Sequence, residues 1–72
     1  MDIPAMTVER LYAMRAHQWR TARMAERMAT HSHFGGAEYY TSLAHNCDQA
    51  IVFINDKIER RGASLINPQE AA

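Results

Sequence analysis

Apolar side chains recur every three or four residues along two long segments of the chain, and the Gly35-Gly36 pair separates the two segments. The first segment has no internal glycine or proline and is rich in strong helix formers such as Ala, Met, Arg and Leu. The second runs up to Gly62, and glycine commonly terminates helices. The pattern predicts an all-α fold, a two-helix antiparallel hairpin forming one domain over 1–72. We expect helices at about 5–30 and 37–61, a turn at 31–36 and a flexible tail at 63–72.

The start of the first helix has two candidate signals. Pro4 suits the first turn of a helix, and Thr7 can cap a helix that begins one residue later. At the far end of the second helix, Lys57, Arg60 and Arg61 complement the negative end of the helix dipole. These signals predict the direction and approximate length of both helices.

Helical spacing of about 100° per residue gathers one apolar stripe on each helix. The first helix contributes Val8, Leu11, Met14, Gln18, Trp19, Ala22, Ala25 and Ala29. The second contributes Tyr40, Leu43, Ala44, Cys47, Ala50, Ile51, Ile54 and Ile58. Antiparallel pairing sets Ala29 opposite Tyr40 and Ala25 opposite Leu43, so that small side chains face large ones. It also sets Ala22 opposite Cys47 and Leu11 opposite Ile58. We expect Arg15 and Gln18, which interrupt the first stripe, to reach its edge or to make a polar contact that fixes the register.

A second stripe on each helix is left over once the hairpin has closed. On the second helix it comprises Tyr39, Ser42, Asn46, Gln49 and Phe53, and on the first helix Met6, Arg10, Ala13, His17, Arg20, Met24 and Met28. Aromatic, methionine and arginine side chains are enriched at protein interfaces. One interpretation is self-association of two hairpins into a four-helix bundle. The other is binding to a different, larger protein, and a homodimer that uses one stripe can bind a target through the other. The predicted partner-binding residues are Tyr39, Ser42, Asn46, Gln49, Phe53, Arg20 and Met24.

The size of the chain favours self-association. A single core is marginal in 72 residues, and disulfides, metals or oligomerisation often supply the missing stability. The only cysteine is Cys47, so no internal disulfide can form, and a lone thiol fits a reducing cytoplasm. No apolar run approaches the length of a membrane span, and the Met-Asp-Ile-Pro start does not resemble a signal peptide.

Metal, cofactor and catalytic chemistry find little basis in the sequence. His31 and His33 fall in the predicted turn, and His45 and Cys47 point about 160° apart on a helix, so no zinc-type ligand set arises. The carboxylates are scattered, and two helices form no deep pocket to activate them. The sequence therefore predicts a non-enzymatic protein that uses no cofactor.

Basic residues leave a nucleic-acid interpretation open. Arg20, Arg23 and Arg27 line one side of the first helix, and such a face can contact phosphates. Eight basic and eight acidic residues nevertheless balance over the whole chain, which argues against nucleic acid as the main partner.

In its two helices, its Phe34-Gly35-Gly36 turn and its apolar stripes, the chain resembles small helical hairpins that dimerise into four-helix bundles, such as a plasmid copy-number regulator that binds paired RNA loops. It is also similar to small phage-encoded proteins that inhibit host factors, including quorum-sensing activators. The resemblance implies a regulator or anti-activator whose target is a larger host protein, for example a transcriptional activator or an ATPase. The alternatives are a nucleic-acid-binding bundle and a structural subunit of a larger assembly.

Overall fold

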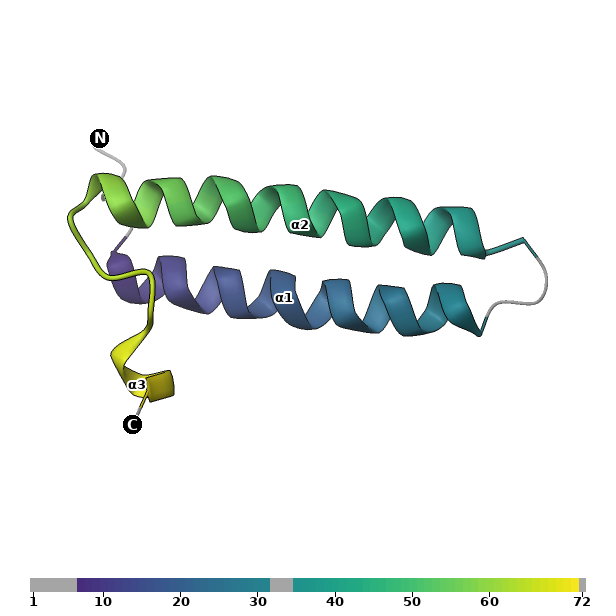
Figure 1. The fold of residues 1–72 in the computed structure, drawn as a ribbon, viewed down its shortest axis with the longest axis horizontal. Coiled ribbons are helices and arrows are strands. Elements are labelled where there is room, and N and C mark those ends of the chain that lie inside the picture. Colours follow the sequence, from purple (N-terminus) through teal and green to yellow (C-terminus); the bar gives the residue numbers. More distant parts are fainter. Residues whose placement is uncertain (1–6, 32–34, 72) are drawn as a thin grey trace, which may run out of the picture.

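The computed structural model describes residues 7–31 and 35–71, and this part of the chain forms an antiparallel pair of long helices with one short helix at the open end (Figure 1). Helix α1 spans Val8–Thr30, α2 spans Ala37–Arg60 and α3 spans Pro68–Ala71. The molecule measures 45 × 36 × 16 Å, so the hairpin is a single layer of helices. The predicted contributions of Pro4, Met6, His33 and Phe34 lie outside the described residues.

Thr7 sets the start of α1. Its backbone is extended, and its Oγ1 accepts a hydrogen bond of 3.2 Å from the backbone N–H of Arg10. The helix therefore begins at Val8 instead of at about residue 5, because this cap satisfies a donor that has no partner within the helix. Glu9 adds a negative charge to the first turn, where the helix dipole favours it.

Gly62 ends α2, as the sequence predicts. Its φ is +71°, a left-handed conformation that glycine adopts at little cost. Its N–H donates to the carbonyl of Glu59 at 2.8 Å, and the N–H of Ala63 donates to the carbonyl of Ile58 at 3.2 Å. This pair of bonds is a Schellman motif, and Ala63 packs against the same apolar cluster as Ile58. Gly35 is the second described residue with positive φ, at +84°, and it precedes α2.

The core between α1 and α2 changes in character along the hairpin. At the open end Leu11, Tyr12, Ile54 and Ile58 form a cluster of buried large side chains. Further towards the turn, small side chains take over, and the buried residues there are Ala22, Ala25, Ala44 and Cys47. The pairing of Leu11 with Ile58 is confirmed. Four members of the predicted α2 stripe are buried, namely Ala44, Cys47, Ile54 and Ile58, and the other four, Tyr40, Leu43, Ala50 and Ile51, are half-buried.

The predicted α1 stripe is wrong at three positions. Trp19 is 55% exposed and Met14 is 38% exposed, whereas Tyr12 is buried. The line of contact with α2 runs through Arg15 and Gln18, both half-buried, so Trp19 and Met14 lie on opposite edges of it. Arg15 can occupy this line because its apolar stem stays in the interface while its guanidinium reaches the edge.

The residues after Gly62 turn back across the start of α1 (Figure 1). The Tyr12 hydroxyl donates a hydrogen bond of 2.6 Å to the Ser64 carbonyl. Asn67 then starts α3, because its Oδ1 accepts from the N–H of Gln69 and its carbonyl accepts from the N–H of Glu70. We call residues 63–71 the C-terminal strap; the structure gives this segment, expected to be a flexible tail, a defined path.

Candidate interaction surface

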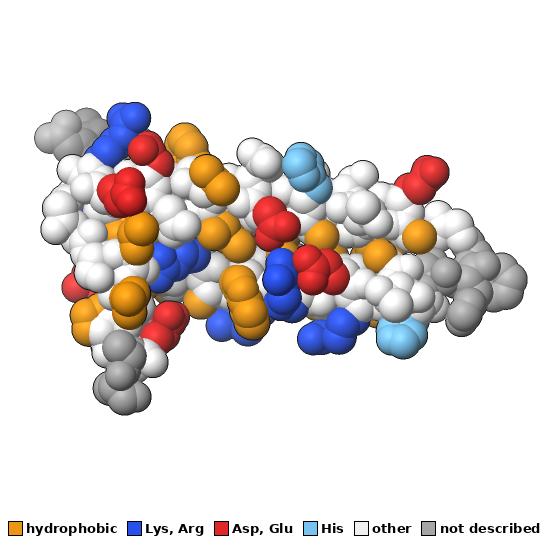
Figure 2. Space-filling model, viewed as in Figure 1, with side chains coloured by type: hydrophobic (Ala, Val, Ile, Leu, Met, Phe, Trp, Pro, Cys, Tyr) orange, Lys and Arg blue, Asp and Glu red, His pale blue; other side chains and the backbone are white. Residues whose placement is uncertain are grey.

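Polar contacts between α1 and α2 mark one broad side of the hairpin, which we call the charged face. Arg15 Nη1 donates to Asn55 Oδ1 at 2.9 Å, as expected for a contact that fixes the register. Arg23 Nη2 lies 3.4 Å from Asp48 Oδ1 and 2.9 Å from Glu26 Oε1. Figure 2 shows basic and acidic side chains meeting midway along the hairpin. These contacts neutralise much of the charge on this side.

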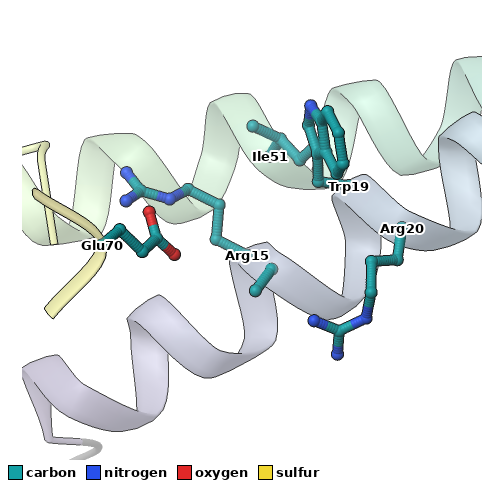
Figure 3. Close-up of a pocket in the computed structure, with 6 residues that line it drawn as sticks. Arg15, Trp19, Arg20, Ile51 and Glu70 are labelled. Carbon is teal, nitrogen blue, oxygen red and sulfur yellow. The ribbon is translucent and has the colours of Figure 1, made fainter.

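A groove lies on the charged face between α1, α2 and the C-terminal strap (Figure 3). Its volume is about 540 Å³, and it is lined by Arg15, Ala16, Trp19, Arg20, Ile51 and Glu70. Figure 3 shows the Glu70 carboxylate directed toward Arg15 from the strap. The guanidinium of Arg23 lies 5.6 Å from the centre of the Trp19 ring, within the range of a cation–π contact. Trp19 is thus an exposed aromatic side chain set among arginines.

The opposite broad side has a different composition on α1. The α1 residues in contact with α2 follow a three–four spacing through Leu11, Arg15, Gln18, Ala22 and Ala25. A second line with the same spacing lies about 100° around the helix, on the side away from the Arg15–Asn55 contact. It comprises Met14, His17, Thr21, Met24 and Met28. The three methionines of this line are all exposed.

Helix α2 contributes a matching line to this side. Its contact residues follow the spacing of Ala44, Cys47, Ile51, Ile54 and Ile58, and the line about 100° away comprises Tyr39, Leu43, Asn46, Ala50, Phe53 and Lys57. Tyr39 is 66% exposed and Phe53 is 62% exposed. Tyr39 packs edge-on against Tyr40 with ring centres 5.2 Å apart, and Lys57 Nζ lies 4.8 Å from the centre of the Phe53 ring. We call these two lines together the apolar face.

All seven predicted partner-binding residues are exposed, but they do not form one patch. Tyr39, Asn46, Phe53 and Met24 belong to the apolar face. Ser42 and Gln49 fall on the outer side of α2, turned farthest from α1 by helical spacing. Arg20 instead lines the groove beside Trp19.

Sequence reasoning assigned some members of the apolar face to the core and overlooked others. Met14, Leu43 and Ala50 were placed in the core stripes, and Thr21 was placed in none. Leu43, Ala50 and Thr21 are half-buried along the middle of the apolar face, beside the contact between the two helices, and Met14 is exposed. The signals that identify them are the repeat 14–17–21–24–28 on α1 and the repeat 39–43–46–50–53–57 on α2, which have the same three–four spacing as the contact lines.

The described residues bring no three histidine, cysteine or carboxylate side chains together in a way that could hold a metal ion. Cys47 is buried between the helices, as predicted. No helix in the described part of the chain is long and apolar enough to cross a membrane. The prominent features of the site are therefore its two faces: the apolar face and the charged face with its groove.

Comparison of the chain with protein-family models, curated proteins and solved structures found no match. The fold and surface define a helical hairpin with one apolar and one charged face.

Proposed function

We propose that this protein is a small non-enzymatic regulator that acts by binding other protein chains through its helix faces. Its partners are a second copy of itself, giving a four-helix bundle, and a larger protein that it inhibits or adapts. The residues proposed to carry partner binding are Tyr39, Asn46 and Phe53, with Met24 and Arg20 beside them and Ser42 and Gln49 at the margin.

One observation supports this proposal above the others: large apolar side chains are exposed in helical register on a molecule one layer thick. Tyr39 and Phe53 are each more than 60% exposed, and three methionines lie on the same face. Contiguous apolar patches on a protein surface commonly mark protein interaction sites. Methionine-rich surfaces in particular adapt to the shape of a partner.

Nucleic-acid binding receives less support. Of the three arginines that could form a phosphate-binding row, Arg23 is engaged by Glu26 and Asp48. Both carboxylates would also repel phosphates that approach this part of α1. The other alternative, a structural subunit of a larger assembly, would use the same apolar face. It differs from the proposed regulator in the number of copies that associate.

The test is affinity capture from a lysate of the source organism with the tagged protein, comparing the wild type with Phe53→Asp. We expect the wild type to retain one larger protein in a fixed ratio and Phe53→Asp to lose it, because a carboxylate on the apolar face must be desolvated on binding. Helicity is expected to stay unchanged, since Phe53 is 62% exposed in the single chain and lies outside the core between α1 and α2.

Val52→Asp is the matched control. Val52 is the neighbouring residue, is similarly exposed at 64%, and lies outside the apolar face. It is expected to retain the target. Equal retention by both variants, or recovery of the tagged chain alone from the wild-type sample, would contradict the proposal.

A further inference from the structure

We infer that the apolar face is occupied by a second copy of the chain, packed face to face with its helical turn at the opposite end of the assembly. This inference rests on the proposed function, since it names the partner that covers the apolar part of the proposed site. It leaves the groove lined by Trp19 and Arg20 free for a larger target that recognises the dimer, so Phe53→Asp, which separates the two copies, also loses this target.

The area of the face fits a stable dimer. A helix of 23 residues is about 35 Å long, and two helices side by side are about 20 Å wide, so the face covers roughly 700 Å², close to the ~800 Å² per partner of standard interfaces. The chain also exposes 5710 Å² of accessible surface, whereas a compact chain of 8.2 kDa exposes about 4500 Å². Covering one face would remove much of this excess.

The angle between the stripes fits a four-helix bundle. Each helix of such a bundle contacts two neighbours, so it needs two apolar lines roughly a quarter turn apart. Both α1 and α2 have a second line about 100° from the first, and both second lines face the same side of the hairpin. The charged face has no comparable pair of lines, because Arg23, Glu26 and Asp48 occupy its centre.

The order of residues along α2 indicates how the copies are oriented. If the turns lie at opposite ends, α2 packs antiparallel on α2 of the partner copy, and each residue meets the one at the mirrored position. With residue 48 at the twofold axis, Tyr39 of one copy lies opposite Lys57 of the other, Leu43 lies opposite Phe53, and Asn46 lies opposite Ala50. The pairs match a cation with an aromatic ring, a branched apolar chain with a phenyl ring, and an amide with a small side chain.

The order along α1 agrees with this arrangement. With residue 21 at the twofold axis, Met14 of one copy lies opposite Met28 of the other, and the two copies of Thr21 face each other. Leu11 and Ile58 pack in the same cluster, so they lie at the same height along the hairpin. Ten residues closer to the turn on each helix, Thr21 and Asp48 therefore also lie at the same height. The two sets of pairs therefore use the same twofold axis, which a rigid hairpin requires.

Charge opposes the other face-to-face arrangement, with both turns at the same end. In that arrangement α1 packs on α2 of the partner copy, and the open ends of the two copies come together, each with Arg10 beside Met14 and Lys57 beside Phe53 on the apolar side. Met24 would then face Asn46. The opposite-end arrangement separates these basic side chains and sets Leu43 against Phe53 and Met14 against Met28.

The first test measures the mass of the protein in solution by sedimentation equilibrium over a dilution series. The wild type is expected at twice 8.2 kDa and Phe53→Asp at the monomer mass, with Val52→Asp remaining a dimer. A monomeric wild type at every concentration, or a Phe53→Asp protein that stays dimeric, would overturn the inference.

The second test locates the twofold axis with a cysteine cross-link. Thr21→Cys is made in a Cys47→Ala background, with Thr41→Cys as the control because Thr41 is exposed away from the apolar face. Mild oxidation is expected to give a disulfide-linked dimer of Thr21→Cys and monomer of Thr41→Cys. Equal yields of cross-linked dimer would overturn the opposite-end arrangement, as would dimers of Thr21→Cys that do not cross-link.

The two proposals fail in different ways. A wild-type monomer that still captures a larger protein removes the dimer and leaves the proposed regulator. A wild-type dimer that captures nothing removes the larger target and leaves the dimer.

Discussion

Gly62 is the residue on which both the end of α2 and the path of the C-terminal strap depend. Its φ of +71° allows the two terminal hydrogen bonds to Glu59 and Ile58. A Cβ added there would meet no heavy atom within 4 Å. The requirement for glycine is therefore conformational, because the left-handed region is costly for residues with a side chain.

Gly62→Ala is expected to lower the free energy of unfolding by about 1 kcal/mol, because alanine pays the cost of the left-handed conformation without any steric clash. Chemical denaturation followed by circular dichroism measures this change. Gly62→Asn should lower the free energy of unfolding by less, since asparagine tolerates the left-handed conformation better than alanine does. A Gly62→Ala protein as stable as the wild type would show that the Schellman motif does not hold the end of α2.

The positions of Tyr12 and Trp19 show where prediction from the sequence stops at this scale. Both are large aromatic residues on α1, and the sequence favoured Trp19 for the core. The α1 residues that contact α2 are instead centred on Arg15 and Gln18. Because these two residues are polar, a search for apolar positions does not find this line of contact. Tyr12 gains burial because the strap covers it and Ser64 accepts its hydroxyl hydrogen bond.

At the scale of the elements, small side chains set the distance between α1 and α2. Ala22 and Ala25 are fully buried, and Ala44 and Cys47 lie nearly as deep on the other helix. Side chains of this size let two helix backbones approach closely, and protein interiors leave few voids for a larger group. The middle of the hairpin has no room for added atoms without moving a helix.

Ala22→Leu is therefore expected to destabilise the hairpin by about 1–3 kcal/mol through overpacking. Ala13→Leu makes the same change at an exposed position of the same helix and should alter stability by less than about 0.5 kcal/mol. Urea unfolding of the two variants gives the comparison. Equal stability of both would mean that α1 and α2 can separate at Ala22 without cost.

Most of the element arrangement could be predicted, because it depends on local signals. The glycines at 35 and 62, the Thr7 cap and the three–four spacing of α2 each act within a few residues. The strap could not be predicted, since its path depends on the contact between Tyr12 and Ser64, which lie 52 positions apart. The groove lined by Trp19 and Glu70 was missed for the same reason.

At the scale of the whole molecule, the hairpin is too thin to bury much of its apolar surface alone. Only eight hydrophobic residues of the described chain are buried, and four of them are alanine or cysteine. A core of this size supplies little stability at this chain length. Association of two hairpins into two layers would roughly double the number of helix faces that avoid water.

The melting temperature is accordingly expected to rise with protein concentration. For a dimer that dissociates as it unfolds, each tenfold increase in concentration adds about 1.4 kcal/mol to the apparent free energy of unfolding. Thermal unfolding of the wild type and Phe53→Asp at several concentrations tests this, with a shift expected only for the wild type. A wild-type melting temperature that is independent of concentration would contradict it.

The burial of Cys47 gives the molecule an internal reporter of its own motions. Its thiol is only 4% exposed and sits where α1 and α2 approach closely, so a thiol reagent can reach it only when the helices part. The rate of labelling under native conditions then measures how often the hairpin opens. A partner that docks across both helices should slow this reaction, and one that binds a single helix should leave it unchanged. Binding could thus be followed, and its footprint classified, without an added label.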